Sequence, residues 1–234
     1  TIEEVRGKIP VIAGAGTNDT AKTIDMARYA RSAGADGALV VTPYYNKPTQ
    51  RGLVAHYTEI AQGVDIPIVV YNVPSRTCAN VLPGTLAELA QIDTIVAVKE
   101  ASGDLEQIGL IGALCGDLIT ILSGDDTLTL PILSVGGQGV ISVVANIVPQ
   151  DVARVVALYL AGEHKNALQH FYRLLPLSKA MFIETNPIPV KTAAAIMGLT
   201  EEDMRLPLVP MEGEHRSQLT AALCAYGVME EVPA

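Results

Sequence analysis

The sequence contains few cysteines, no cluster of basic residues and no long apolar run. Its three cysteines, Cys78, Cys115 and Cys224, are odd in number and widely spaced, which favours a reducing, cytoplasmic compartment over a disulfide framework. The net charge of -9 argues against nucleic acid as a partner, because phosphate binding requires clustered Lys and Arg. The four histidines lack the spacing of metal ligands, so we expect no metal site. No apolar run reaches the about 18 residues of a membrane span, and we expect no membrane partner.

The 234 residues are 49% hydrophobic, enough to bury a large core. Six apolar strands alternate with helices at a spacing of roughly 20 to 30 residues, which is typical of successive βα units in a parallel sheet. Polar loops follow the strands, as in a TIM (β/α)8 barrel. An open doubly wound sheet would also accept six strands, but Gly14 to Asp19 lacks the third glycine of its phosphate-binding fingerprint. The predicted strands are Pro10–Gly14, Gly37–Thr42, Ile66–Asn72, Ile95–Val98, Ile119–Ser123 and Gly139–Val143.

The chain beyond Pro149 has only helical patterns. We therefore expect an α/β fold with a partial TIM barrel of six βα units over residues 1–162 and an all-helical C-terminal region over residues 163–234. The helices predicted there are Val152–Leu160, His164–Phe182, Ile188–Met197 and Glu214–Tyr226.

Lys99 stands where a buried apolar strand ends in a polar, glycine-containing turn. Desolvation at such a position lowers the pKa of a lysine and makes its amine a nucleophile able to form a Schiff base with a carbonyl compound. Alternatively, Lys99 pairs with Glu100 or emerges into solvent. Taken alone, this alternative is favoured, since strand ends often carry surface lysines.

Three more polar side chains follow neighbouring strands. Tyr45, Tyr71 and Lys99 lie at successive strand ends, and Arg76 lies just beyond Tyr71. On a barrel these ends converge, so an amine nucleophile, a phenol able to relay protons and a guanidinium able to bind a carboxylate would share one site. Each has an ordinary alternative: Tyr71 packs in the barrel, Arg76 is a surface charge, and Tyr44 and Tyr45 form an interface pair. Their common location favours the functional interpretation.

The chain from Ile9 to Leu223 closely resembles the dihydrodipicolinate synthases. These enzymes belong to the class I, Schiff-base, pyruvate-dependent aldolases, which also include N-acetylneuraminate lyase. The resemblance implies a TIM barrel with a C-terminal helical region, usually assembled as a homotetramer. It implies condensation of pyruvate with L-aspartate-4-semialdehyde to 4-hydroxy-tetrahydrodipicolinate in lysine biosynthesis, with no cofactor besides the covalent imine. The motifs that carry it are Thr42–Pro48, Val70–Thr77, Val98–Asp104, Ser123–Asp126 and Gly139–Ser142.

Matching motif to motif, Lys99 resembles the lysine that condenses with pyruvate, and Tyr71 resembles the proton donor and acceptor beside it. Tyr45 resembles a tyrosine that reaches across a dimer interface to complete a neighbour's proton relay. Arg76 resembles the residue that holds the carboxylate of aspartate semialdehyde. The Arg76 loop and the tyrosine pair favour the synthase over the sugar-acid lyases.

Further positions of the family map onto both halves of the chain. Gly124 and Ile141 resemble backbone contributors to the pyruvate pocket. Asn18, Lys22 and Tyr44 match a site at which lysine inhibits many bacterial members. Strongly inhibited members tend to have an acidic residue at the position of Lys22, and a cation there repels the ammonium group of the inhibitor. We therefore expect weak or absent lysine feedback.

The family's Gly-Thr-Thr-Gly-Glu motif has no copy in this sequence. We therefore expect the chain to correspond to the family without its first two βα units, and the synthase activity of a 234-residue molecule to be impaired. A related pyruvate-dependent aldolase acting on a sugar acid, or a non-catalytic paralogue that keeps the pyruvate pocket, are the alternative functions.

Overall fold

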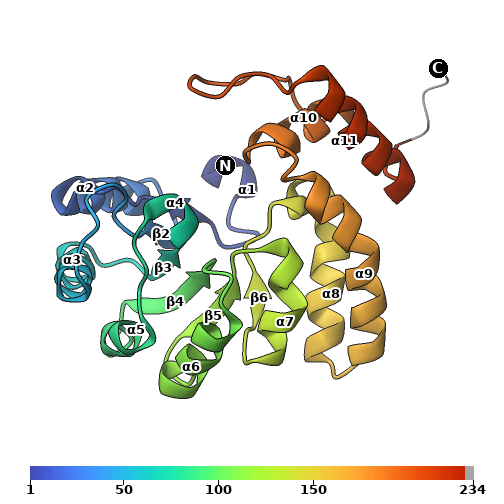
Figure 1. Ribbon diagram of the computed structural model, residues 1–234. Helices are drawn as coiled ribbons and strands as arrows, with labels where there is room; N and C mark the ends of the chain where they lie inside the picture. The colour runs from blue at the N-terminus through green and yellow to red at the C-terminus, as the bar shows by residue number, and fades with distance from the viewer. Residues whose placement is uncertain (230–234) are drawn as a thin grey trace. The chain divides into compact units, whose positions relative to one another are not determined.

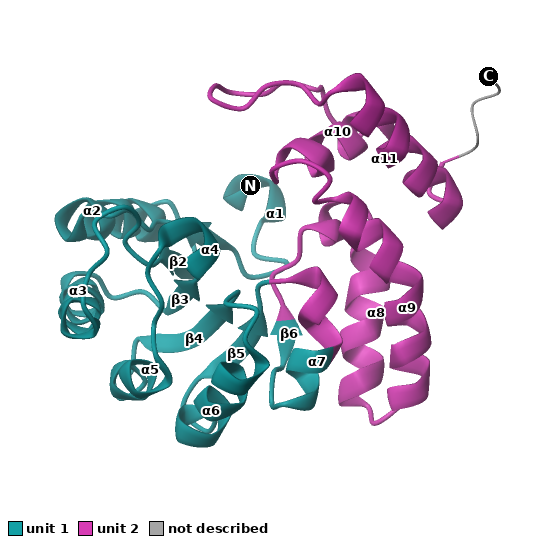
Figure 2. Ribbon diagram, viewed as in Figure 1, with its two compact units in different colours: residues 1–124, 131–139 teal, residues 125–130, 140–234 magenta. Residues whose placement is uncertain are grey.

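The structure is a computed structural model that describes residues 1–229 (Figure 1). These residues form two compact units (Figure 2). The first unit comprises residues 1–124 and 131–139, and the second comprises residues 125–130 and the chain from residue 140 onward. The predicted division after residue 162 falls inside the second unit and stays a prediction.

Six strands form one sheet and follow one another in sequence order. The strands β1 to β5 pair in parallel, each with the next, as the alternation of strands and helices predicts. Their bounds are Ile12–Gly14 (β1), Gly37–Val41 (β2), Ile68–Asn72 (β3), Ile95–Glu100 (β4), Thr120–Ser123 (β5) and Gly139–Val140 (β6). All six predicted strands are thereby confirmed.

The last strand is shorter than predicted. It ends at Val140 rather than Val143. The backbone N–H groups of Val143 and Val144 donate to the carboxylate of Asp126, at 2.9 and 3.2 Å, and the chain then enters a short 3-10 helix, η2, at Val144–Asn146. These donors are therefore used by a side chain instead of a neighbouring strand.

Helices pack against the sheet of the first unit. Val40, Val70 and Val98 in the strands are fully buried, and so are Leu53 and Ile108 in the helices, as expected for a parallel sheet covered by helices. In Figure 1, α2, α3, α5 and α6 lie next to one another along the strands. The helices that begin in this unit are α1 (Ile2–Val5), α2 (Thr20–Ser32), α3 (Gln50–Gly63), α4 (Pro74–Thr77), α5 (Pro83–Leu89) and α6 (Leu105–Cys115).

Capping side chains fix where the longer helices begin. Asp19, Thr49 and Asp104 accept hydrogen bonds from the backbone N–H three residues later and start α2, α3 and α6. The short helix α4 replaces the loop predicted after β3, with Pro74 in its first turn. Two further short elements follow β5, namely the 3-10 helix η1 (Asp126–Leu128) and α7 (Thr129–Ser134).

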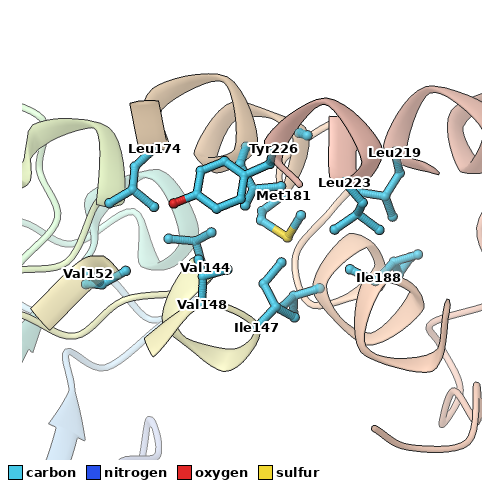
Figure 3. Packing of buried hydrophobic residues seen from close by; sticks show 14 of the residues in the cluster. Val144, Ile147, Val148, Val152, Leu174, Met181, Ile188, Leu219, Leu223 and Tyr226 are labelled. Atoms are coloured by element: carbon cyan, nitrogen blue, oxygen red, sulfur yellow. The ribbon is translucent and has the colours of Figure 1, made fainter. Parts of the chain in front are cut away.

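The second unit is helical after β6. Its helices are α8 (Pro149–Leu160), α9 (His164–Ala180), α10 (Ile188–Ile196) and α11 (Gly213–Tyr226), and among residues 149–229 there is no strand, as predicted. The core of the unit is a cluster of buried apolar side chains in which Val144, Ile147, Met181, Leu219 and Leu223 lie together (Figure 3).

Candidate active site

The ends of β3 and β4 bring Tyr71 and Lys99 together. The two residues are partners in the parallel register of these strands, so their side chains leave the same face of the sheet. The Lys99 amine lies 4.1 Å from the centroid of the Tyr71 ring, within the range of a cation–π contact. Both residues are half-buried. The structure thus places an amine and a phenol next to each other in a partly desolvated position.

Arg76 lies close enough to Tyr71 to influence its ionisation. It stands in α4, which begins two residues after β3, and it is exposed. Burial raises the pKa of the Tyr71 phenol, and the positive charge of Arg76 partly offsets that effect. The phenol therefore stays protonated at neutral pH and can give a proton to a neighbouring group.

Gly124 leaves space for the Lys99 side chain. A Cβ atom at this position would lie 2.6 Å from the Cβ of Ala101 and 3.2 Å from the Cε of Lys99. The backbone N–H of Gly124 donates to the carbonyl of Glu100 at 2.7 Å. A residue with any side chain would therefore press on the lysine or break the link between the ends of β4 and β5.

Ile141 belongs to the second unit. It directly follows β6 and precedes Ser142, whose hydroxyl donates to the carboxylate of Asp126. Its predicted contribution to a pyruvate pocket stays a prediction.

Tyr45 lies at the surface of the first unit. It lies in the loop after β2 with a positive φ of 74° and is 89% exposed, while its neighbour Tyr44 is 42% exposed. A positive φ is unusual for a tyrosine. The exposed ring is compatible with the predicted role across a dimer interface, which stays a prediction.

The residues of the predicted lysine site lie near the start of α2. The side chain of Asn46, in the loop with Tyr44, donates to the carbonyl of Asn18 at 3.0 Å. Lys22 lies in the first turn of α2 and is exposed. The hydrogen bond thus joins the loop after β1 to the loop after β2, and the regulatory role of the three residues is untested.

Sequence reasoning missed the pair Asn72 and Glu100, which follows Tyr71 and Lys99. The Asn72 amide donates to both carboxylate oxygens of Glu100, at 3.2 and 3.0 Å, and the backbone N–H of Ser102 donates to one of them at 2.7 Å. Both side chains are buried. The only signal for this pair in the sequence is that the apolar runs of β3 and β4 each end in two polar residues, Tyr71-Asn72 and Lys99-Glu100, instead of one.

Two kinds of feature are absent from the part of the chain that the structure describes. Within residues 1–229 no three His, Cys, Asp or Glu side chains are grouped so that they could hold a metal ion. In the same residues no helix has the length and apolar character needed to cross a membrane.

Comparison with known proteins gives one consistent result. The model of the Dihydrodipicolinate synthetase family matches residues 1–226. The 4-hydroxy-tetrahydrodipicolinate synthase of Pelobacter propionicus is 52% identical over 228 residues, which are 97% of this chain and 79% of that protein. The 4-hydroxy-tetrahydrodipicolinate synthase of a Thermoanaerobacter species is 53% identical over 232 residues, 99% of this chain and 78% of that protein.

Solved structures agree with the sequence matches. The dihydrodipicolinate synthase of Thermotoga maritima superimposes with a TM-score of 0.96 at 46% identity, covering 97% of this chain and 79% of that one. A chloride-inhibited dihydrodipicolinate synthase of Acinetobacter baumannii, solved in complex with pyruvate, gives a TM-score of 0.95 at 39% identity, covering 97% of this chain and 78% of that one. The predicted fold class is confirmed, because the solved relatives are TIM-barrel proteins.

Proposed function

The chain belongs to the dihydrodipicolinate synthetase family, and from that premise we propose that it condenses pyruvate with L-aspartate-4-semialdehyde through an imine on Lys99. The observation that carries the proposal is the Lys99 amine held 4.1 Å from the centre of the Tyr71 ring at the ends of β3 and β4. The pyruvate complex of the Acinetobacter relative supports pyruvate as the first substrate.

Imine formation needs one nucleophile and one group that moves protons. The Lys99 amine attacks the ketone carbon of pyruvate, and a C–N bond forms as the carbonyl oxygen takes up a proton. Water then leaves this carbinolamine, and the leaving hydroxyl requires a proton that Tyr71 can supply. The raised pKa of the Tyr71 phenol suits it to the role of acid, because the phenol is protonated before the step begins.

The second half of the reaction makes a carbon–carbon bond. Loss of a methyl proton converts the imine to an enamine, whose terminal carbon attacks the aldehyde carbon of aspartate semialdehyde. The amino group of that substrate then attacks the imine carbon, closes the ring and releases Lys99. Arg76, exposed beside Tyr71, is suited to bind the carboxylate of the second substrate.

Borohydride trapping tests the imine directly. The chain is incubated with pyruvate, reduced with sodium borohydride, and its labelled residue is located by peptide mass spectrometry. We expect a pyruvate adduct on Lys99 in the native chain and in the control Lys165→Arg, which changes an exposed lysine in α9. No adduct is expected in Lys99→Arg. A folded native chain without an adduct, or an adduct elsewhere in Lys99→Arg, would contradict the proposal.

Arg76 separates the two substrates experimentally. Loss of a charge-assisted carboxylate contact should raise the KM for aspartate semialdehyde about ten- to a hundred-fold in Arg76→Ala. Trapping of pyruvate on Lys99 should be retained. An unchanged KM for the semialdehyde would assign its carboxylate to another residue.

We also propose that the chain works as a homo-oligomer in which Tyr45 serves a neighbouring protomer. The exposed Tyr45 ring supports this, since a side chain that reaches a partner leaves its own protomer. Mixing the variants Tyr45→Phe and Lys99→Arg should restore synthase activity in mixed oligomers that neither variant has alone. A sedimentation measurement that finds only monomers would contradict the assembly.

Weak feedback by lysine is proposed on the basis of Lys22. The exposed ammonium group of Lys22, four residues after Asn18 in the first turn of α2, repels the side-chain charge of a lysine inhibitor. Inhibition by submillimolar lysine would refute this, whereas Lys22→Glu should increase the sensitivity of the enzyme to lysine.

A further inference from the structure

Asn72 and Glu100 directly follow the reactive residues Tyr71 and Lys99 in β3 and β4. In the register of β3 and β4, Tyr71 faces Lys99 and Asn72 faces Glu100. Because side chains alternate along a strand, the second pair leaves the opposite face of the sheet. Glu100 is 1% exposed and Asn72 is fully buried. Any movement of this pair along or across the strands therefore moves the two preceding residues as well.

The Glu100 carboxylate accepts hydrogen bonds from neighbouring backbone and side chains. The Asn72 amide bridges both oxygens, and the Ser102 N–H reaches one of them. The Asn72 carbonyl oxygen in turn accepts from the N–H of Val81 at 3.0 Å, and its amide also donates to Asn80 at 2.8 Å. These bonds hold the pair in one geometry, because a half-turn of the Asn72 amide would place its carbonyl oxygen against the Glu100 carboxylate and its NH2 group against the N–H of Val81.

Further residues fix this pair from the helices. The amide of Asn80 donates to Gln107 of α6 at 2.8 Å, and Gln107 donates back at 3.1 Å. Gln107 is itself held at the start of α6, where its N–H binds the Asp104 cap. The carboxylate at the end of β4 is thus connected through amide side chains to the first turn of a helix.

Backbone hydrogen bonds join the end of β4 to both of its neighbouring strands, β3 and β5. The N–H of Ala101 donates to the carbonyl of Asn72 at 2.9 Å, and the Glu100 carbonyl accepts from Gly124 at 2.7 Å. Gly124 also borders the Lys99 side chain. The residues immediately after Lys99 are therefore tied to β3 on one side and to the end of β5 on the other.

Burying a carboxylate between two strands carries a free-energy penalty, because the charged group loses its contact with water. Burial raises the pKa of Glu100, and the hydrogen bonds from Ser102, Asn72 and Gln107 act against that rise. Apolar side chains of similar volume would join the strands without this cost. A polar pair offers what apolar contacts lack, which is one defined distance and direction between the two strand ends.

We propose that the Asn72–Glu100 pair is a positioning pair that holds the Lys99 amine against the Tyr71 ring and thereby sets the rate of imine formation. The proposal rests on the proposed function of Lys99 as the pyruvate-binding amine. A displacement of about 1 Å at a reacting group can cost about a hundred-fold in rate. The pair thus acts through Lys99 and Tyr71 without touching the substrate.

The variant Glu100→Gln tests the proposal in the full chain. Its new amide group must face the amide of Asn72, so that two donors oppose each other. We expect the maximal rate of borohydride-trapped imine formation to fall about ten- to a hundred-fold, while the pyruvate concentration at half-maximal rate changes by less than about two-fold. The rate and the half-saturation are measured by quenching at several times and pyruvate concentrations.

Two further variants separate positioning from stability. Tyr57→Phe removes a buried hydrogen bond from α3 to the carbonyl of Val40 in β2, at 3.0 Å, and serves as the control: it should lower the melting temperature and leave the imine rate unchanged. The double variant Glu100→Gln/Asn72→Asp reverses the polarity of the pair, so that the new amide on β4 donates to the new carboxylate on β3. It should recover the native rate to within about three-fold.

Each outcome decides the question. If the native chain forms the Lys99 adduct and Glu100→Gln forms it equally fast, the positioning role is wrong while the proposed function stands. If the native chain forms no adduct, the proposed function itself fails. If Glu100→Gln does not fold, the folded double variant carries the test, and a folded but slow double variant overturns the proposal. If neither variant folds, the pair determines stability rather than position and the proposal is likewise overturned.

Discussion

The two units each bury a carboxylate, and they satisfy it in different ways. In the first unit Glu100 is held mainly by the side-chain amide of Asn72, with one backbone donor. In the second unit Asp126 binds two backbone N–H groups and the hydroxyl of Ser142. A carboxylate held by backbone donors shapes a turn, whereas one held by an amide side chain fixes two side chains relative to each other. The chemistry proposed for the first unit depends on a carboxylate held by an amide side chain.

The histidines of the two units show a similar contrast. His56 in α3 is 6% exposed, and burial lowers its pKa to about 4. His215 in α11 forms an ion pair with Glu184 at 2.8 Å, and that hydrogen bond raises its pKa. The buried histidine of the first unit is therefore neutral above about pH 4, whereas the protonated form of the histidine in the second unit is stabilised by its partner.

The largest expected effect concerns Asp126. In Asp126→Ala two backbone donors and a hydroxyl lose their acceptor inside the second unit, so we expect the free energy of unfolding to fall by about 3 to 5 kcal/mol. Urea denaturation measures it. The control Asp25→Ala removes an exposed carboxylate whose ion pair with Arg28 is long, at 3.8 Å, and should change stability by less than about 0.5 kcal/mol. A loss below about 1 kcal/mol in Asp126→Ala would remove the contrast between the two carboxylates.

The second largest expected effect is a loss of stability at low pH. Because the folded state keeps His56 neutral down to about pH 4 while the unfolded chain takes up the proton near pH 6.5, stability is complete above pH 6.5 and is lost as the pH falls through this window. The loss should reach about 3 kcal/mol at pH 4. Urea denaturation at a series of pH values checks it, with His56→Phe expected to lose this dependence. The control His164→Gln, at the start of α9, should retain the dependence fully.

The smallest effect belongs to the surface pair of the second unit. The hydrogen bond between the two side chains raises the pKa of His215 and lowers that of Glu184. Its contribution to stability is therefore present between about pH 4.5 and 6.5, and it is lost as the pH rises through the folded pKa of His215. An NMR titration of the His215 ring should give a pKa above 6.5 that returns toward that value in Glu184→Gln. An unshifted ring would show that the pair does not form in solution.

Local sequence predicted much of the first unit because its strands are apolar and β-branched. Runs such as Ile68–Val70 have no polar residue that could interrupt them, and Tyr71 and Lys99 stand out where such runs end. Four residues from Pro74 to Thr77 are too few to show helical periodicity, so α4 was missed.

The parts that escaped prediction depend on contacts between distant residues. The Asn72–Glu100 pair becomes visible only through the register of β3 and β4, which no single segment specifies. The early end of β6 depends on Asp126, whose carboxylate takes the donors of Val143 and Val144. In both cases the deciding group is a carboxylate far along the chain from its partners.

The absence of a side chain at Gly124 has a consequence for how this protein can vary. Its backbone φ lies outside the left-handed region that favours glycine, so the chain itself would accept an alanine there. The obstacle is the methyl group, which would occupy space next to the Lys99 Cε and the Ala101 Cβ. In a saturation library at position 124, selection for activity should therefore recover only glycine. Larger residues next to Lys99 would not restore the activity of another variant, because they would narrow the same space further. Position 124 is therefore expected to remain glycine in every active variant of this protein.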